Sequence, residues 1–147
     1  QIAVDRAQTG RAMADAIART KAEVETGRQL VIFPEGTRRP PGAAPDYKRG
    51  IQRLYRDLGV PVIPVVMHPG LFWPRGSFRR QGGHFIVRIL PAIAPGAEPR
   101  QFFDQLVETM ERESDRLLIE TVDANPHLDL PEVTRKRVAE LRASDGA

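Results

Sequence analysis

Residues 31–40 read Val-Ile-Phe-Pro-Glu-Gly-Thr-Arg-Arg-Pro, an apolar run that meets a proline and passes directly into charged residues. The run over residues 29–33 is short, apolar and β-branched, which predicts a buried strand. Ligand sites in α/β proteins collect where strands end. The stretch therefore places an acid, a glycine and two arginines where a binding site is expected.

The groups that follow this strand suit an anionic ligand. Gly36 allows the backbone to turn or to approach a ligand closely. Arg38 and Arg39 offer forked donors that match phosphate or carboxylate. Glu35 could hold an arginine in place or accept a proton from a substrate hydroxyl. From the residues alone, a polar turn in which Glu and Arg pair with each other is an equal alternative.

The rest of the chain alternates helical and extended patterns. Helices are predicted over 9–26, 51–58, 100–122 and 131–142, strands over 60–66 and 84–90, and loops over 34–47 and 67–83. The core face of the long helix is predicted to carry Phe103, Leu106, Met110, Leu117 and Leu118. Pro61 and Pro64 predict a strand that is irregular or lies near a sheet edge. This order predicts an α/β fold, a layered mixed sheet flanked by helices.

Composition excludes several classes of protein. A chain of 147 residues with 28% charged residues fits one globular domain rather than a disordered segment. The absence of cysteine excludes a disulfide framework and a Cys-ligated metal site, and no metal is expected. No apolar run is long enough to span a membrane. Because no nucleic-acid module is recognisable, no nucleic-acid partner is expected despite the net charge of +3.

Basic residues gather after the motif. Arg49, Arg53 and Arg56 share one face of the helix predicted over 51–58, and Lys48 precedes it. For Arg53 and Arg56 a solvated helix face is the favoured interpretation. For Lys48 and Arg38 an anion site is favoured.

These residues resemble a known family. The block Phe33–Arg38 resembles a signature of the glycerolipid acyltransferases, the group that includes 1-acylglycerol-3-phosphate acyltransferase. Residues 60–65 resemble the family's fourth block, residues 47–50 its Phe-Lys-x-Gly step, and residues 2–6 the end of its second block. Residues 1–122 are therefore expected to be the C-terminal part of a glycerol-3-phosphate acyltransferase-like domain whose N-terminal part is missing. Residues 123–147 are expected to form a polar, partly helical tail.

The resemblance implies an activity and a set of site residues. The family transfers an acyl group from coenzyme A or acyl carrier protein to a glycerol-phosphate hydroxyl, here that of lysophosphatidic acid, and no further cofactor is expected. Implied substrate-binding residues are Arg6, Glu35, Gly36, Thr37, Arg38 and Lys48, and implied pocket-shaping residues are Phe33, Pro34, Pro61 and Pro64. The resemblance also implies work at the cytosolic face of a membrane.

One loop bears on the membrane expectation. Arg75, Arg79 and Arg80 alternate with aromatic residues, among them Trp73 and Phe78, in a pattern that suits a lipid interface. An ordinary loop that folds onto the core through its aromatic side chains explains the same pattern equally well.

The family's catalytic base is absent from this sequence. That base is the His of a His-x-x-x-x-Asp motif, in which the Asp orients the imidazole. Five residues after His68, His84 and His127 stand Trp73, Ile89 and Glu132, so no such motif is present. The motif is expected upstream of Gln1, which would make this chain an inactive fragment. The alternative is a non-catalytic module that binds phosphate or a lipid headgroup.

Overall fold

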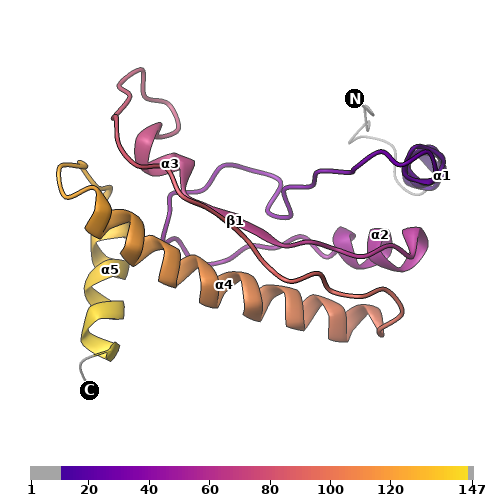
Figure 1. Ribbon diagram of the computed structural model, residues 1–147. Helices are drawn as coiled ribbons and strands as arrows, with labels where there is room; N and C mark the ends of the chain where they lie inside the picture. The colour runs from indigo at the N-terminus through magenta and orange to yellow at the C-terminus, as the bar shows by residue number, and fades with distance from the viewer. Residues whose placement is uncertain (1–10, 146–147) are drawn as a thin grey trace.

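The computed structural model describes residues 11–145, with side chains over residues 17–144. The elements in chain order are α1 (Arg11–Glu25), α2 (Gly50–Leu58), β1 (Val65–Met67), α3 (Pro69–Phe72), β2 (Val87–Ile89), α4 (Pro99–Ala124) and α5 (Glu132–Asp145). Figure 1 shows α4 running the length of the molecule beneath β1, with α5 at one end of it and α2 at the other. All four predicted helices are present, and Thr9, at which the first was predicted to begin, lies outside the described residues.

The sheet of the described residues consists of β1 and β2, which pair antiparallel with Val66 opposite Arg88. A single further bridge joins Val62 to Ile93. The ladder starts only after Pro64, because proline has no N–H to donate to a neighbouring strand. The α/β class and the predicted irregularity at Pro64 are confirmed, while both strands are shorter than predicted.

The prediction of a buried strand over residues 29–33 is wrong. In the described residues this segment has no paired strand. Val31 and Phe33 are 74% and 73% exposed. Apolar and β-branched residues favour an extended backbone, but a strand also needs a neighbour to receive its hydrogen bonds. Here the segment borders a large cavity instead of a second strand.

The long helix α4 supports most of the core. Its N-cap is Glu98, whose carboxylate accepts hydrogen bonds from the backbone N–H groups of Arg100 and Gln101. Phe102, rather than the predicted Phe103, is fully buried and stacks on Tyr55 of α2 with ring centroids 3.7 Å apart. Phe103 is only partly buried. The other predicted core positions agree with the structure, because Leu106, Leu117 and Leu118 are buried and Met110 packs against the core.

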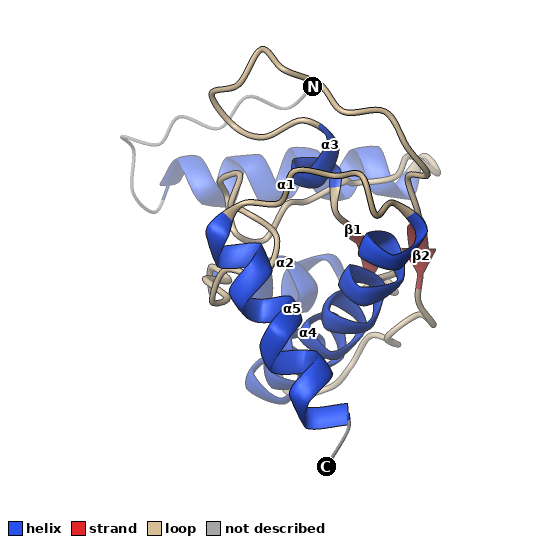
Figure 2. Ribbon diagram, turned by 90° about the vertical axis from the view of Figure 1, so that its left-hand side faces the viewer, coloured by secondary structure: helices blue, strands red, loops and turns tan. Residues whose placement is uncertain are grey.

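Two helix ends show how the chain changes direction. Gly59 adopts φ 62° after α2 and donates its N–H to the Tyr55 carbonyl, and the helix ends at Leu58 as the predicted range 51–58 requires. After α4 the chain turns at Asn125 and enters α5, which lies across the end of α4 (Figure 2). Leu128 and Val138 pack there against Leu71 and Leu118. Within the described residues, no helix combines the length and the low charge that a membrane crossing needs.

Candidate functional site

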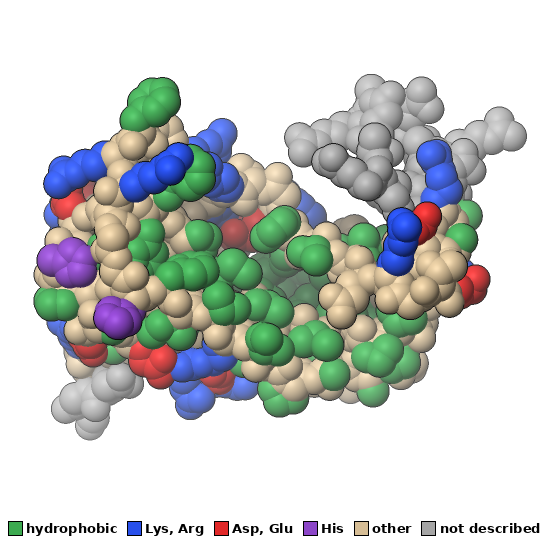
Figure 3. Space-filling model, turned by 45° about the horizontal axis from the view of Figure 1, so that its top comes forward, with side chains coloured by type: hydrophobic (Ala, Val, Ile, Leu, Met, Phe, Trp, Pro, Cys, Tyr) green, Lys and Arg blue, Asp and Glu red, His purple; other side chains and the backbone are tan. Residues whose placement is uncertain are grey.

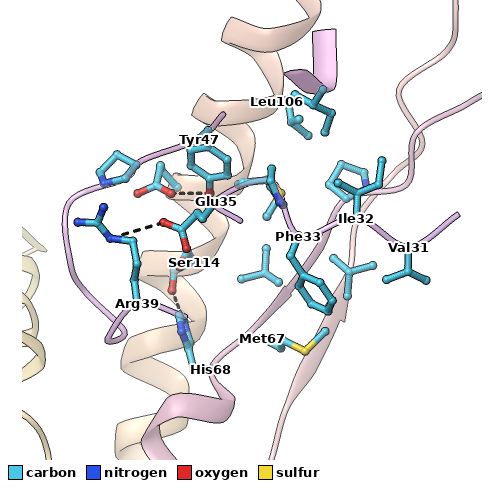
Figure 4. A pocket seen from close by; sticks show the side chains of 18 of the residues that line it. Val31, Ile32, Phe33, Glu35, Arg39, Tyr47, Met67, His68, Leu106 and Ser114 are labelled. Atoms are coloured by element: carbon cyan, nitrogen blue, oxygen red, sulfur yellow. Dashed lines mark hydrogen bonds and ion pairs between the residues drawn. The ribbon is translucent and has the colours of Figure 1, made fainter. Parts of the chain in front are cut away.

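A cavity of about 1340 Å³ lies between α4, β1 and the segment that carries the motif. Figure 3 shows the hollow with apolar side chains around it. The apolar part of its wall includes Val31, Ile32, Phe33, Ile63, Val65 and Met67. The polar part includes Glu35, Thr37, Arg38, Arg39 and Arg75. Figure 4 shows Glu35 and Arg39 on one side of the cavity, and Val31 and Phe33 on the other.

The motif makes a tight turn at the cavity wall. Gly36 has φ +66° and donates its N–H to the Phe33 carbonyl at 3.0 Å. A Cβ at this position would meet no other atom, so the turn needs glycine for its backbone conformation alone. The Lys48 N–H donates to the Pro34 carbonyl at 2.8 Å, which joins the motif to the segment ahead of α2.

Arg38 lies at the cavity with a guanidinium that has no acidic partner. Its Nη2 donates to the Trp73 carbonyl at 2.9 Å, and its Cζ lies 5.7 Å from the centroid of the Trp73 ring. Arg75 Nη1 approaches Thr37 Oγ1 at 3.4 Å. Among the ion pairs of the described residues, none joins a carboxylate to Arg38 or Arg75. Two cations at the wall therefore remain free to bind an anion.

The other predicted basic residues are already paired. Lys48 Nζ donates to Asp46 at 2.7 Å, and this hydrogen bond holds the pKa of the Asp46 carboxyl below its usual value. Lys48 is absent from the residues that line the cavity. Arg39 lies 3.4 Å from Asp46 and 4.0 Å from Glu35. The cavity wall thus depends on Arg38 and Arg75 for uncompensated positive charge.

The other residues predicted from the sequence lie at the cavity wall, on an exposed helix face, or outside the described residues. Phe33, Pro34, Pro61 and Pro64 all line the cavity. Arg53 and Arg56 of α2 lie on an exposed face and pair with Asp57, as the solvated-face interpretation predicts. Arg6 lies outside the described residues. Within the described residues, no three His, Asp or Glu side chains converge as a metal site would require.

The cavity has a polar wall on α4 that the sequence interpretation missed. Tyr47 donates its hydroxyl to Glu111 Oε1 at 2.7 Å, and burial raises the pKa of both groups. His68 Nε2 lies 2.9 Å from the Ser114 carbonyl, and burial lowers the pKa of the imidazole. His68 lies in the connection between β1 and α3, as the loop prediction requires, but it is only 6% exposed.

A sequence signal for this wall does exist. Glu111, Ser114 and Asp115 stand at i, i+3 and i+4, a spacing that places polar groups on one helix face. They lie within a helix whose other buried residues are apolar except for Thr121. Arg75 carries no comparable signal, because its contact with Thr37 joins residues far apart in the sequence.

Several known proteins are similar to this chain in sequence. A family model described as Acyltransferase matches residues 1–68. A 1-acyl-sn-glycerol-3-phosphate acyltransferase from Pseudomonas aeruginosa is 35% identical over 100 residues, which are 67% of this chain and 39% of the relative. The 1-acyl-sn-glycerol-3-phosphate acyltransferase alpha of Homo sapiens is 31% identical over 93 residues, which are 63% of this chain and 33% of the relative.

A solved structure is also similar. The crystal structure of the 1-acyl-sn-glycerophosphate (LPA) acyltransferase PlsC from Thermotoga maritima aligns with a TM-score of 0.62 and 26% identity. The alignment covers 74% of this chain and 44% of that one. The chain thus spans well under half the length of these relatives.

Proposed function

We propose that this chain forms the lipid-acceptor part of an enzyme that converts lysophosphatidic acid to phosphatidic acid, since a family model described as Acyltransferase matches residues 1–68. The acyl group comes from a thioester of coenzyme A or acyl carrier protein. The observation that carries the proposal is that uncompensated guanidinium groups adjoin an apolar wall in the same cavity.

The two parts of the cavity match the two parts of the acceptor. Lysophosphatidic acid joins a phosphate monoester to an acyl chain through glycerol. The Arg38 guanidinium can bind two phosphate oxygens at once, and Thr37 adds a hydroxyl beside it. The wall that includes Val31, Phe33 and Met67 offers apolar surface to the acyl chain. One bound molecule satisfies both kinds of wall.

The proposed chemistry needs a base that these residues do not contain. The acceptor hydroxyl loses its proton to an imidazole as its oxygen attacks the thioester carbonyl. Collapse of the tetrahedral intermediate expels the thiolate, which takes the proton back from the imidazolium. We assign this imidazole to a His-x-x-x-x-Asp motif encoded ahead of Asp5. Glu35 and Arg38 then position the acceptor, at the cytosolic face of the membrane.

Arg38 is the residue through which the proposal is tested. In the longer protein that carries such a motif, thiol release from acyl-coenzyme A should depend on lysophosphatidic acid. Arg38→Ala should raise the acceptor KM about 10- to 100-fold, the value of a charge-assisted hydrogen bond, with a smaller change in kcat. Arg53→Ala, which removes an exposed arginine from α2, is the matched control and should change neither constant.

The possible results separate the two functions considered for this chain. No thiol release with any acceptor would contradict an acyltransferase. Binding of lysophosphatidic acid without turnover, in a protein whose coding sequence lacks the motif, would instead support a headgroup-binding module. An unchanged acceptor KM in Arg38→Ala would remove that arginine from the site.

A further inference from the structure

The segment between α3 and β2 forms a protruding loop with a tied base, visible in Figure 1 as the excursion beyond α3. The Gln81 N–H donates to the Phe72 carbonyl at 2.8 Å and closes the loop. The Gln81 side chain donates to the Leu71 carbonyl at 3.0 Å and accepts the Asp129 N–H at 2.7 Å. This loop over residues 72–81, the 72–81 loop hereafter, is therefore held in place by the body of the protein.

The 72–81 loop presents aromatic side chains to the outside. Phe78 is 103% exposed and Trp73 is 48% exposed, whereas Leu71 at the loop base is fully buried. Hydrogen bonds inside the loop shape its tip, since Trp73 Nε1 donates to the Ser77 carbonyl and the Arg79 N–H donates to Ser77 Oγ. An ordered loop that exposes large aromatic rings marks a contact surface.

The charge of the 72–81 loop indicates which kind of partner surface it contacts. Arg75, Arg79 and Arg80 are its only charged residues. Arg80 lies with its Cζ 4.3 Å from the Trp73 ring centroid. No ion pair of the described residues involves these three arginines, while the arginines of α2 are paired with Asp57. Exposed aromatic rings among unpaired arginines match an anionic bilayer, whose boundary region accepts both.

We propose that the 72–81 loop docks this protein on an anionic lipid surface, with Phe78 and Trp73 entering the headgroup region and the arginines at the level of the lipid phosphates. Pro74 and Arg75 also line the cavity. The docked loop therefore places the edge of the cavity at the membrane, where an amphiphile can enter without crossing water. Docking does not depend on acyl transfer and is measured separately from it.

Trp73 is the only tryptophan of the chain and so reports on the loop directly. The full chain is mixed with vesicles of phosphatidylcholine and phosphatidylglycerol, and with vesicles of phosphatidylcholine alone. We expect co-sedimentation with the anionic vesicles only, a blue shift of tryptophan emission, and quenching by lipids brominated on the acyl chain. Binding should weaken as salt is raised, because salt screens exposed charges.

Variants locate the docking surface. Phe78→Ser should weaken vesicle binding about tenfold, and the double variant Arg79→Gln/Arg80→Gln about 25-fold, from roughly fivefold for each arginine. The double variant Arg53→Gln/Arg56→Gln removes the same charge from α2, and Val87→Ser removes an exposed apolar side chain outside the loop. Both controls should bind as the parent does.

Three results would overturn the proposal. The first is a chain that does not bind the anionic vesicles. The second is binding that leaves the Trp73 emission unchanged, because another surface would then hold the lipid. The third is an equal loss in the loop variants and in their controls, which would show attraction by overall charge alone.

Discussion

His68 lies in the wall of the cavity with its imidazole removed from water, and this burial lowers its pKa. The hydrogen bond with the Ser114 carbonyl and the charge of Asp115 act in the opposite direction but offset only part of the effect. Because the pKa of His68 in the folded protein lies below the ordinary histidine value of 6.5, the unfolded chain binds a proton more readily. The stability that His68 contributes is therefore present above that value and is lost as the pH falls through the folded pKa.

His68→Gln should reduce the loss of folding stability that occurs as the pH falls. Urea unfolding of the parent should show a free energy of unfolding that declines as the pH falls below about 6.5, and the variant should decline less. Glu111, whose pKa is raised by burial, acts in the opposite direction, since it lowers the free energy of unfolding as the pH rises above the ordinary value of 4.5. If the free energy of unfolding changes equally with pH in parent and variant between pH 7.5 and 6, then His68 does not cause the loss of stability.

Individual residues differ in how far the sequence could predict them. The need for glycine at position 36 follows from the local chain, and the observed φ of +66° agrees with it. The contact between Arg75 and Thr37 and the bond between Tyr47 and Glu111 span 38 and 64 residues. Such pairs depend on how the elements pack, so spacing in the sequence does not predict them.

At the scale of elements, Asn125 joins the end of α4 to the segment that precedes β2. Its Nδ2 donates to the carbonyls of Thr121 and His84, and its Oδ1 accepts the His84 N–H at 2.6 Å. The side chain is 1% exposed, so water cannot replace these partners. Asn125 therefore fixes the backbone at His84, ahead of β2, against the end of α4.

Asn125→Ala should destabilise the protein by about 3 kcal/mol, because buried backbone groups lose their partners. Asn125→Asp keeps an acceptor for the His84 N–H but loses both donated hydrogen bonds. Urea unfolding should show a lower free energy of unfolding for Asn125→Asp than for the parent. Hydrogen exchange at the His84 N–H should be accelerated more in Asn125→Ala than in Asn125→Asp. A loss below about 0.5 kcal/mol for alanine, the range of an ordinary surface change, would contradict this role.

The elements also show why helices were predicted better than strands. The bounds of α2 follow from apolar spacing and from Gly59, all within a few residues of one another. Residues 29–33 carry an equally clear apolar pattern, yet they form no ladder in the described residues. A helix satisfies its backbone internally, whereas a strand depends on a partner that its own sequence does not specify.

For the molecule as a whole, the last residues pack onto the part of the chain that resembles the family. Thr134 Oγ1 of α5 donates to the Pro41 carbonyl at 2.7 Å, and Arg137 Nη2 pairs with Asp115 of α4 at 2.6 Å. Val138 and Leu128 complete an apolar cluster with Leu118. The polar composition of residues 123–147 concealed these few buried positions. We propose that α5 supports the 34–47 loop that carries the motif.

Two valines of α5 test this role as a matched pair. Val138 is 6% exposed and Val133 is 36% exposed, so only the first lies in the core. Val138→Ala should cost about 2 kcal/mol of unfolding free energy, since it removes buried methyl groups and leaves a cavity. Val133→Ala should cost less than about 0.5 kcal/mol.

The two valine variants should also differ in how fast a protease cleaves the 34–47 loop. Because Thr134 holds Pro41, loosening α5 in Val138→Ala should speed protease cleavage within residues 34–47, while Val133→Ala should be cleaved as slowly as the parent. Since cleavage of a transiently opened state follows the free energy of opening, the increase should match the measured loss of stability. If the 34–47 loop is cleaved at the same rate in both variants although Val138→Ala is less stable, then α5 stabilises the core without supporting the motif.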